Sequence, residues 1–417
     1  MIPSSERPVM SAPLRLALVS AFPPGARSLN EYGLHLATGL AARDDVAEVV
    51  VIADRLPEAM AELDLGPKIR VIRAWSFNSL ATLPVLMRAI RGARVDGVIW
   101  NLQTASFGDR EMTAALGLLA PAAVRMLGIP SGVIAHNVID GIDLEQTMLR
   151  GQKLRQAIVR LGGRAVNRAL ASASYLTVTL RGYHETLTAA YPKASLHLVP
   201  HGTFEVPPGD PAPLSARPDR IVTMGKFGTY KRLGTLLAAF DILRRNPQHA
   251  KLELVIGGTD HPNAAGYLAG LKAERRDDAG VTFAGYIAEG DVPEFFGQAR
   301  LSVFDYTSTT GSSGVLHQTA SHGAVPVFPR IGDFIDICED EGIHGLNYKP
   351  QDAFDMAEQM HIGLTDAAAA QAMATSNHVA ALGFPFSRVV AFHVEKIAAL
   401  RTKATSVDLR EGSAATV

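Results

Sequence analysis

The sequence predicts an α/β fold made of two Rossmann-like domains that face each other across a cleft. Its 417 residues leave room for two or three domains of about 100–200 residues each. Short apolar, β-branched runs alternate with longer helical patterns, which is typical of βαβ units and a parallel sheet. A proline-rich stretch interrupts this alternation near the middle of the chain and indicates two separate domains.

The first half of the chain contains a series of strand candidates that are apolar almost throughout, as expected for strands buried on both faces. Helical patterns such as 31–42 and 82–91 lie between them. The strand candidates are 14–20, 48–53, 69–72, 96–100, 132–135, 175–179 and 196–199.

Residues 205–219 hold five prolines, so they cannot form a central strand or a helix interior, and we interpret them as a linker. The alternation then resumes with strand candidates at 220–224, 252–256, 281–284, 301–305 and 325–328. The predicted organisation is a domain over 1–204, the linker, a second domain over 220–384, a helix over 385–403 that packs back on the first domain, and a disordered tail over 404–417.

The composition argues against several functional classes. The formal net charge of -1 gives no reason to expect nucleic-acid binding. A single cysteine, Cys338, excludes an internal disulfide and a cysteine-ligated zinc site. No run approaches the ~20 apolar residues that span a bilayer, and the first dozen residues lack the apolar core of a secretion signal. We therefore expect a cytoplasmic protein.

The first strand does not lead into a dinucleotide-binding loop. It is followed by "AFPPGARSLNEYG", whose prolines do not match G-x-G-x-x-G, and no Walker A sequence is present. In the second domain, Lys226 lies at the end of a strand and Lys231 near the start of the next helix. Two cations and a helix N-terminus at this edge suit a diphosphate, although two solvated surface lysines would fit the same pattern.

The stretch "TGSSGVLHQTASHG" at 310–323 supplies uncharged groups for the same purpose. It joins a strand to a helix, so the amides of Ser313, Gly314, Val315 and Leu316 are expected to be first-turn donors suited to an anion. The alternative is a simple capping turn in which Ser312 or Ser313 is the N-cap.

The order of the motifs resembles the GT-B glycosyltransferases, specifically family 4 of the retaining nucleotide-sugar enzymes, over most of the chain. The motifs that carry this resemblance are, in chain order, "LALVSAFPPGA", "GVIAHN", "LHLVPHGT", "MGKFGTYKRLGTLLAAF", "LELVIGGTD", "VTFAGYIAEGDVPEFF", "SSGVLHQTASHGAVPV" and "PFSRVVAFHVEKI".

The resemblance implies a role for each residue that matches a family motif. Lys226 and Lys231 would grip the donor diphosphate, and lysine at 226 replaces the more usual arginine. His136 would face the donor sugar and steady charge as the glycosidic bond loosens. The remaining donor-binding residues would be Gly25, Tyr286, Ile287, Thr310, Gly311, Ser312, Ser313, Gly314, Val315, Leu316 and Gln318.

One departure from the family pattern concerns its two glutamates, whose positions here hold Thr310 and Gln318. Gln318 keeps an acceptor oxygen for the ribose hydroxyls, whereas Thr310 offers the sugar only a hydroxyl. Asp305, at the predicted strand end, is the candidate to replace the missing carboxylate.

The resemblance implies a metal-independent, retaining transfer from a nucleoside-diphosphate sugar to a sugar or lipid-linked alcohol, in cell-surface or exopolysaccharide synthesis. It needs no enzymic nucleophile and no cofactor, because the protein positions the reactants and stabilises the leaving diphosphate. Two alternatives stay open: a GT-B nucleotide-sugar epimerase, which needs acid–base carboxylates, and a non-catalytic nucleotide-sugar-binding relative.

Residues 147–170 contain six Arg or Lys and no Asp or Glu, with apolar residues at roughly helical spacing. This pattern suits peripheral contact with an anionic membrane, and equally an ordinary amphipathic helix with a solvated basic face. The pair Gly162-Gly163 argues against one uninterrupted helix.

Overall fold

The computed structural model describes residues 12–25, 27–56, 60–138, 153–204, 209–309 and 311–414, with the side chains of 153–160 and 404–414 outside this description. The chain divides into two compact units. The first unit comprises Met1–Val178, Tyr183–Leu198 and Val390–Val417, and the second comprises Thr179–Gly182 and Val199–Val389.

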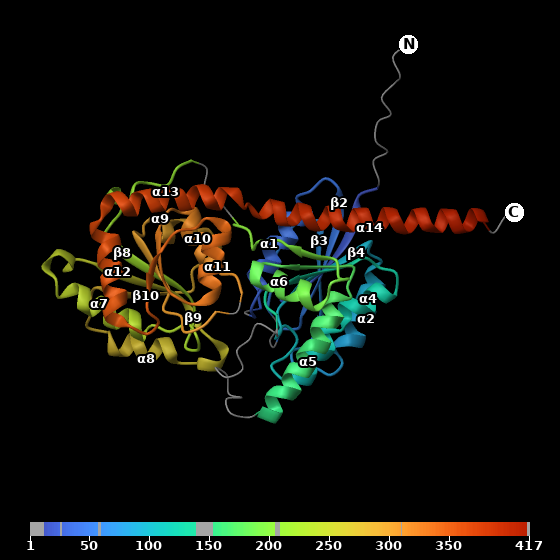
Figure 1. Cartoon of the computed structure of the whole chain (residues 1–417), viewed down its shortest axis with the longest axis horizontal. Coiled ribbons are helices and arrows are strands. Elements are labelled where there is room, and N and C mark those ends of the chain that lie inside the picture. The colour runs from blue at the N-terminus through green and yellow to red at the C-terminus, as the bar shows by residue number, and fades with distance from the viewer. Residues whose placement is uncertain are drawn as a thin grey trace, which may run out of the picture. The chain divides into compact units, whose positions relative to one another are not determined.

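The first unit is built on a parallel sheet in the order β3-β2-β1-β4-β5-β6-β7 (Figure 1). Its elements are β1 (Leu14–Val19), α1 (Asn30–Ala41), β2 (Val46–Asp54), β3 (Ile69–Trp75), α2 (Thr82–Ala93), β4 (Gly97–Leu102), α3 (Glu111–Leu118), α4 (Ala120–Met126), β5 (Ser131–Ala135), α5 (Lys153–Ala171), β6 (Tyr175–Val178), α6 (Arg181–Ala190) and β7 (Leu196–Leu198). The strand order reverses between β1 and β4, and sheets of this type bind ligands at the edge next to such a reversal.

The inner strands β4 and β5 are buried along their whole length, as expected where helices cover both faces of a sheet. Trp75, Trp100 and Phe107 are fully buried at the centre of the core. The last helix, α14 (Phe386–Ala414), packs here as well, since the Tyr175 hydroxyl and Nδ1 of His393 are hydrogen-bonded at 2.9 Å.

The second unit repeats the arrangement with a parallel sheet in the order β10-β9-β8-β11-β12-β13 (Figure 1). Its elements are β8 (Arg220–Phe227), α7 (Gly234–Arg244), β9 (Glu253–Asp260), α8 (Tyr267–Glu274), β10 (Val281–Gly285), α9 (Val292–Gly297), β11 (Leu301–Val303), α10 (Gly314–Ser321), β12 (Val325–Pro329), α11 (Gly332–Glu341), β13 (Leu346–Tyr348), α12 (Ala353–Thr365) and α13 (Ala367–Gly383). Here the strand order reverses between β8 and β11.

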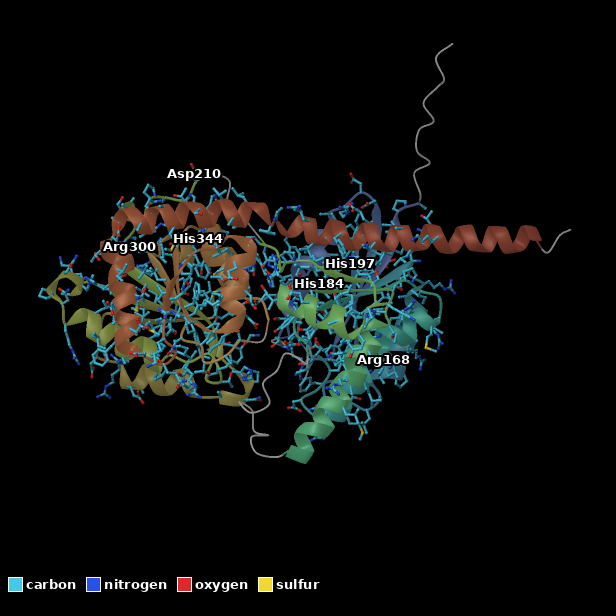
Figure 2. All side chains as sticks on the ribbon, viewed as in Figure 1. Arg168, His184, His197, Asp210, Arg300 and His344 are labelled. Carbon is cyan, nitrogen blue, oxygen red and sulfur yellow. The ribbon has the colours of Figure 1, made fainter. Side chains whose placement is uncertain are left out.

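Side chains fill the space between sheet and helices in each unit (Figure 2). In the second unit, neighbouring residues of β8 enter different cores, as the period of two along a strand requires. Ile221 packs with residues of α7 and α12, whereas Val222 packs with Phe296 of α9 on the opposite face. These two cores support the fold prediction, and the architecture is confirmed as a pair of parallel α/β sheets.

Two features differ from the sequence-based prediction: one edge strand and the end of the last helix. Every predicted strand is present, but the short edge strand β13 was missed because "LNY" has too few apolar residues to form a recognisable run. Helix α14 continues to Ala414, past residue 403, where the sequence analysis expected a disordered tail. Residues 415–417 lie outside the described residues.

The described part of the proline-rich segment, residues 209–219, is packed against the second unit. Leu214 begins a 3-10 helix and is 3% exposed in the core. The buried guanidinium of Arg217 donates to the carbonyls of Ala212 at 3.0 Å, Ala299 at 2.7 Å and His322 at 2.9 Å. These bonds anchor the segment at the C-terminal ends of α9 and α10, where carbonyls lack helical partners.

Helix α5 continues through Gly162 and Gly163 without a break, so the interruption expected from this pair is wrong. Each glycine costs the helix about 1 kcal/mol relative to alanine, but burial of Val166 and Leu170 in the core compensates for it. Among the described residues, no helix is long and apolar enough to cross a membrane.

Candidate functional site

The second unit places Lys226 and Lys231 at the point where its strand order reverses. Lys226 is the penultimate residue of β8, and Lys231 forms an isolated β-bridge with Tyr306, just beyond β11. The Nζ atom of Lys231 lies 4.7 Å from the centre of the Tyr306 ring, a cation–π contact. Gly225 makes room for this side chain, because a Cβ at that position would lie 3.2 Å from Cδ of Lys231.

A third titratable group belongs to this cluster. Burial, followed by the positive charges of Lys226 and Lys231, lowers the pKa of His261, which follows β9. Nδ1 of His261 accepts a hydrogen bond from the amide of Asn263 at 3.2 Å, so a neutral ring carries its proton on Nε2. His261 was not among the residues predicted from the sequence, although its place directly after a strand of the parallel sheet was a usable signal.

The structure corrects the expectation that the helix after Lys231 offers its N-terminus to a diphosphate. Asp305 already caps that helix, α7, since its Oδ2 accepts from the amides of Thr235 at 2.8 Å and Leu236 at 3.1 Å. Asp305 is 2% exposed, and burial raises its pKa. The same contacts exclude Asp305 as a replacement for the missing sugar-binding carboxylate, because its Oδ2 is committed to the protein's own backbone.

The loop before α10 differs from the start of α7 because some of its backbone amides have no partner in the described structure. The amide of Gly311 donates to Oδ2 of Asp333 at 2.7 Å, and Ser313 is the N-cap, its Oγ accepting from the amide of Leu316 at 3.3 Å. Leu316 was expected to offer its amide to an anion, and this cap shows that it cannot do so while the turn is closed. Within the part of the chain that the structure describes, the amides of Gly314 and Val315 have no hydrogen-bond partner.

The remaining residues of this loop add one polar group. Oγ of Ser312 is buried and has no partner among the described residues, which marks it as a group a ligand could satisfy. Gln318 is half-buried on α10, four residues after Gly314. Thr310 lies outside the described residues.

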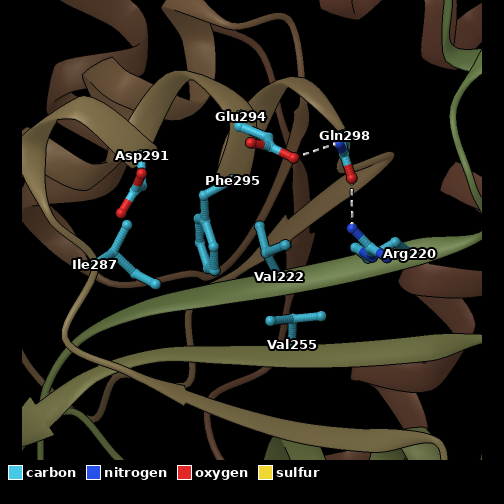
Figure 3. Close-up of a pocket in the computed structure, with 8 residues that line it drawn as sticks. All are labelled: Arg220, Val222, Val255, Ile287, Asp291, Glu294, Phe295 and Gln298. Atoms are coloured by element: carbon cyan, nitrogen blue, oxygen red, sulfur yellow. Dashed lines mark hydrogen bonds between the residues drawn. The ribbon is translucent and has the colours of Figure 1, made fainter.

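Tyr286 and Ile287 follow β10, as predicted, but their side chains point to different environments. Tyr286 is 64% exposed. Ile287 packs toward Gly257 and Phe295 and lines a cavity of about 210 Å³ between α9 and the sheet (Figure 3). The other predicted site residues do not line this cavity, and a contact of the Tyr286 and Ile287 backbone with a nucleotide base stays a prediction.

In the first unit, His136 directly follows β5 and is 7% exposed. The amide nitrogen of Asn101 donates to Oγ of Ser20 at 2.9 Å and to the carbonyl of Leu29 at 3.2 Å. Its Oδ1 therefore faces His136, whose Nε2–H donates to it at 2.7 Å. Burial lowers the pKa of His136 to about 3, so the ring is neutral at physiological pH.

Gly25 lies in a loop that the first unit holds by charged groups. Oδ1 of Asp54 accepts from the amide of Phe22 at 3.1 Å, and Arg73 donates to the Phe22 carbonyl at 3.0 Å. A Cβ on Gly25 would lie 3.0 Å from that carbonyl oxygen, so the absence of a side chain serves the fold of the loop itself. Asp54 and Asn101 were not predicted from the sequence, although both are polar residues near the carboxyl ends of strands.

We predict that Asp305→Ala lowers the free energy of unfolding by about 1–2 kcal/mol, because it removes the acceptor for two amides of α7. Asp305→Asn keeps an acceptor oxygen and should lose less. Equilibrium denaturation of both variants checks this. Equal stability of Asp305→Ala and the natural protein would contradict the capping role.

Comparisons with known proteins agree with this geometry. The family model described as "Glycosyl transferases group 1" matches residues 218–366. No curated protein sequence matched the chain.

Solved structures resemble nearly the whole chain at low sequence identity. Sucrose-phosphate synthase from Thermosynechococcus elongatus superposes with a TM-score of 0.65 at 17% identity, covering 96% of this chain and 100% of that one. HepE from Anabaena, in complex with UDP and glucose, gives 0.64 at 16% identity, covering 93% and 99%. WaaG, a glycosyltransferase involved in lipopolysaccharide biosynthesis, gives 0.62 at 14% identity, covering 92% and 99%.

The fold expected from the sequence is thus confirmed, and so is the family resemblance. Residues 218–366 match the model of group 1 glycosyl transferases, and the chain as a whole has a two-domain GT-B fold.

Proposed function

We propose that the protein transfers a sugar, with retention of anomeric configuration, from a nucleoside-diphosphate sugar to an alcohol acceptor. The observation that carries this proposal is the meeting of two kinds of anion-binding group where β8 and β11 diverge. Lys226 and Lys231 supply charge, and α10 supplies first-turn amides that the described structure leaves without partners. A diphosphate needs both, because several oxygens must be bound at once.

In the proposed mechanism, the two lysines and the first-turn amides of α10 stabilise the leaving diphosphate. As the glycosidic bond breaks, negative charge grows on the phosphate oxygens, and preorganised cations and amides stabilise that charge more than they stabilise the ground state. The acceptor attacks on the face that the diphosphate leaves, and a phosphate oxygen takes its proton. Neither a metal ion nor another cofactor enters this scheme, since the lysines neutralise the charge. A contact of His136 with the donor sugar stays a prediction.

The titles of the structural neighbours suggest which ligand to try first. HepE was solved with UDP and glucose and, separately, with UDP-glucose, which makes uridine nucleotides the first probes for this chain. WaaG acts in lipopolysaccharide biosynthesis, which supports our proposal of a role in cell-surface or exopolysaccharide synthesis with a sugar or lipid-linked acceptor.

The test is a two-stage assay. A screen of UDP, GDP and ADP for thermal stabilisation identifies the base, because a ligand bound only by the folded state raises apparent stability. Release of that nucleoside diphosphate from its common sugar conjugates then reports transfer. Binding without turnover on any donor and acceptor would favour the non-catalytic relative, and isomerised donor without nucleotide release would favour the epimerase.

Lys231→Ala should weaken nucleoside-diphosphate binding by about 1.5–3 kcal/mol, because it removes a charge-assisted contact. Lys272→Ala, an exposed lysine on α8, is the matched control and should leave affinity unchanged. Isothermal titration with UDP measures both. Unchanged affinity in Lys231→Ala would show that the diphosphate binds elsewhere.

We also propose peripheral contact with anionic membranes through α5. Leu161 on this helix is 71% exposed, and its neighbours Arg164 and Arg168 are exposed as well, the latter labelled in Figure 2. An apolar side chain among cations suits the surface of an anionic bilayer. Residues 139–152, which include the start of the basic stretch, lie outside the described residues.

Liposome flotation checks the membrane contact. We expect more protein with vesicles containing anionic phospholipid than with neutral vesicles, and a reduced difference for the double variant Arg164→Gln and Arg168→Gln, because each basic residue near the surface adds about 1 kcal/mol. Equal recovery with both vesicle types would refute it.

A further inference from the structure

A buried ion pair lies next to the loop before α10, the loop that we propose to bind the diphosphate. His317, in the first turn of α10, and Glu341, the last residue of α11, have side chains that are each 3% exposed. Nε2 of His317 lies 2.8 Å from Oε2 of Glu341. Neither residue was singled out from the sequence, and neither belongs to the groups assigned above to the donor.

The hydrogen bonds of His317 specify its protonation. Its second ring nitrogen, Nδ1, lies 2.8 Å from the carbonyl oxygen of Ser313, which can only accept. An ionised Glu341 can also only accept, so both ring nitrogens must carry protons. The pair therefore holds one shared proton, as an imidazolium beside a carboxylate or, less polarised, as a neutral ring beside a carboxylic acid.

The surroundings favour the imidazolium form. Burial alone would lower the pKa of His317, but the charge and hydrogen bond of Glu341, with the Ser313 carbonyl, outweigh burial and raise it. The His201 ring stacks on His317 at 5.1 Å between ring centres. One further titratable group lies near the pair: burial, followed by the charges of Glu341 and Glu339, raises the pKa of the Cys338 thiol on α11 to about 12, so the thiol stays neutral near neutral pH.

An imidazolium in a first helical turn has a cost for the fold alone, because the N-terminal end of a helix dipole is itself positive. It becomes favourable if an anion binds at that turn. The same helix, α11, also holds the other end of the loop, since Asp333 in its first turn accepts from the Gly311 amide at 2.7 Å. Both ends of the loop are thus attached to one rigid element.

We propose that His317 and Glu341 are a positioning pair for the diphosphate: a shared proton keeps an imidazolium behind the first turn of α10 and holds its amides ready for the anion. This inference rests on the proposed function. His317 acts through the Ser313 carbonyl and through its charge, without touching the ligand.

The pair predicts how anion binding changes with pH. Because the pKa of His317 is raised in the folded protein, its stabilising charge is fully present below the ordinary histidine pKa and is lost as pH rises through the raised value. On deprotonation, the Nε2 lone pair would face the carboxylate and the pair would open. Affinity for an anion should therefore fall as the pH rises through the raised pKa of His317.

The test uses Glu341→Gln, which keeps the shape of the side chain and can donate to a neutral His317 but removes the shared proton. Glu339→Gln makes the same chemical change at an exposed position on the same helix and is the matched control. Titrations with UDP and with inorganic pyrophosphate between pH 7 and 9 measure affinity. We expect Glu341→Gln to bind both about fivefold more weakly at pH 7, and to lose the pH dependence that the natural protein and the control show.

A measurement without ligand reports the protonation state of the His317 ring directly. In protein labelled at its histidines, the imidazole resonances of His317, assigned with His317→Gln, should report a doubly protonated ring at pH 7.5 and a singly protonated one in Glu341→Gln. A singly protonated His317 in the natural protein would overturn the shared proton. Diphosphate binding that is equal in the natural protein and Glu341→Gln would overturn the positioning role alone. No diphosphate binding by the natural protein would refute the proposed function together with that role.

Discussion

The feature on which the site depends is the reversal of strand order between β8 and β11 in the second sheet. In a parallel sheet every strand delivers its following loop to the same edge, and only at a reversal do neighbouring loops turn away from each other. Lys226 and Lys231 follow β8, while Ser312, Ser313 and Gly314 follow β11. Residues more than eighty positions apart therefore follow neighbouring strands at one edge of the sheet because of topology.

Two helices begin at this reversal, and their N-terminal amides are capped by different kinds of side chain. Helix α7 is closed by its own acid, Asp305, whose Oδ2 accepts from two first-turn amides. Helix α10 is capped by an uncharged serine, Ser313, which uses the Leu316 amide and leaves those of Gly314 and Val315 without partners in the described structure. A carboxylate at α10 would repel a diphosphate, whereas a serine cap satisfies the helix and leaves the field of its dipole available. The buried His317–Glu341 pair lies against the same turn, where we propose that it adds a positive charge.

Several features were accessible from residue patterns, and several were not. The apolar runs predicted every strand except β13, whose sequence "LNY" forms no apolar run. Lys226, Lys231 and the glycine–serine loop were recognisable because their residue types and positions after strands suit an anion. The part played by Leu316 was wrong, because a cap uses its amide in a way that depends on the geometry of the turn. Asp305 looked like a free carboxylate at a strand end, and only its distances to Thr235 and Leu236 identified it as a cap. The Gly162-Gly163 pair suggested a break in α5 that tertiary packing prevents.

The sequence by itself determined the class of fold and the chemistry available at the site, because periodicity, turn residues and charge are local properties of the chain. It placed two lysines and a flexible small-residue loop after strands, and topology rules then brought them to one edge. Tertiary structure decided which of these groups remain available, since an amide or a carboxylate is free or occupied according to neighbours that are distant in sequence. Asp333 and Glu341 hold the loop and His317 from the two ends of α11, and His136 is kept neutral by burial beside Asn101. Such pairings depend on distances of about 3 Å, which residue order alone does not encode.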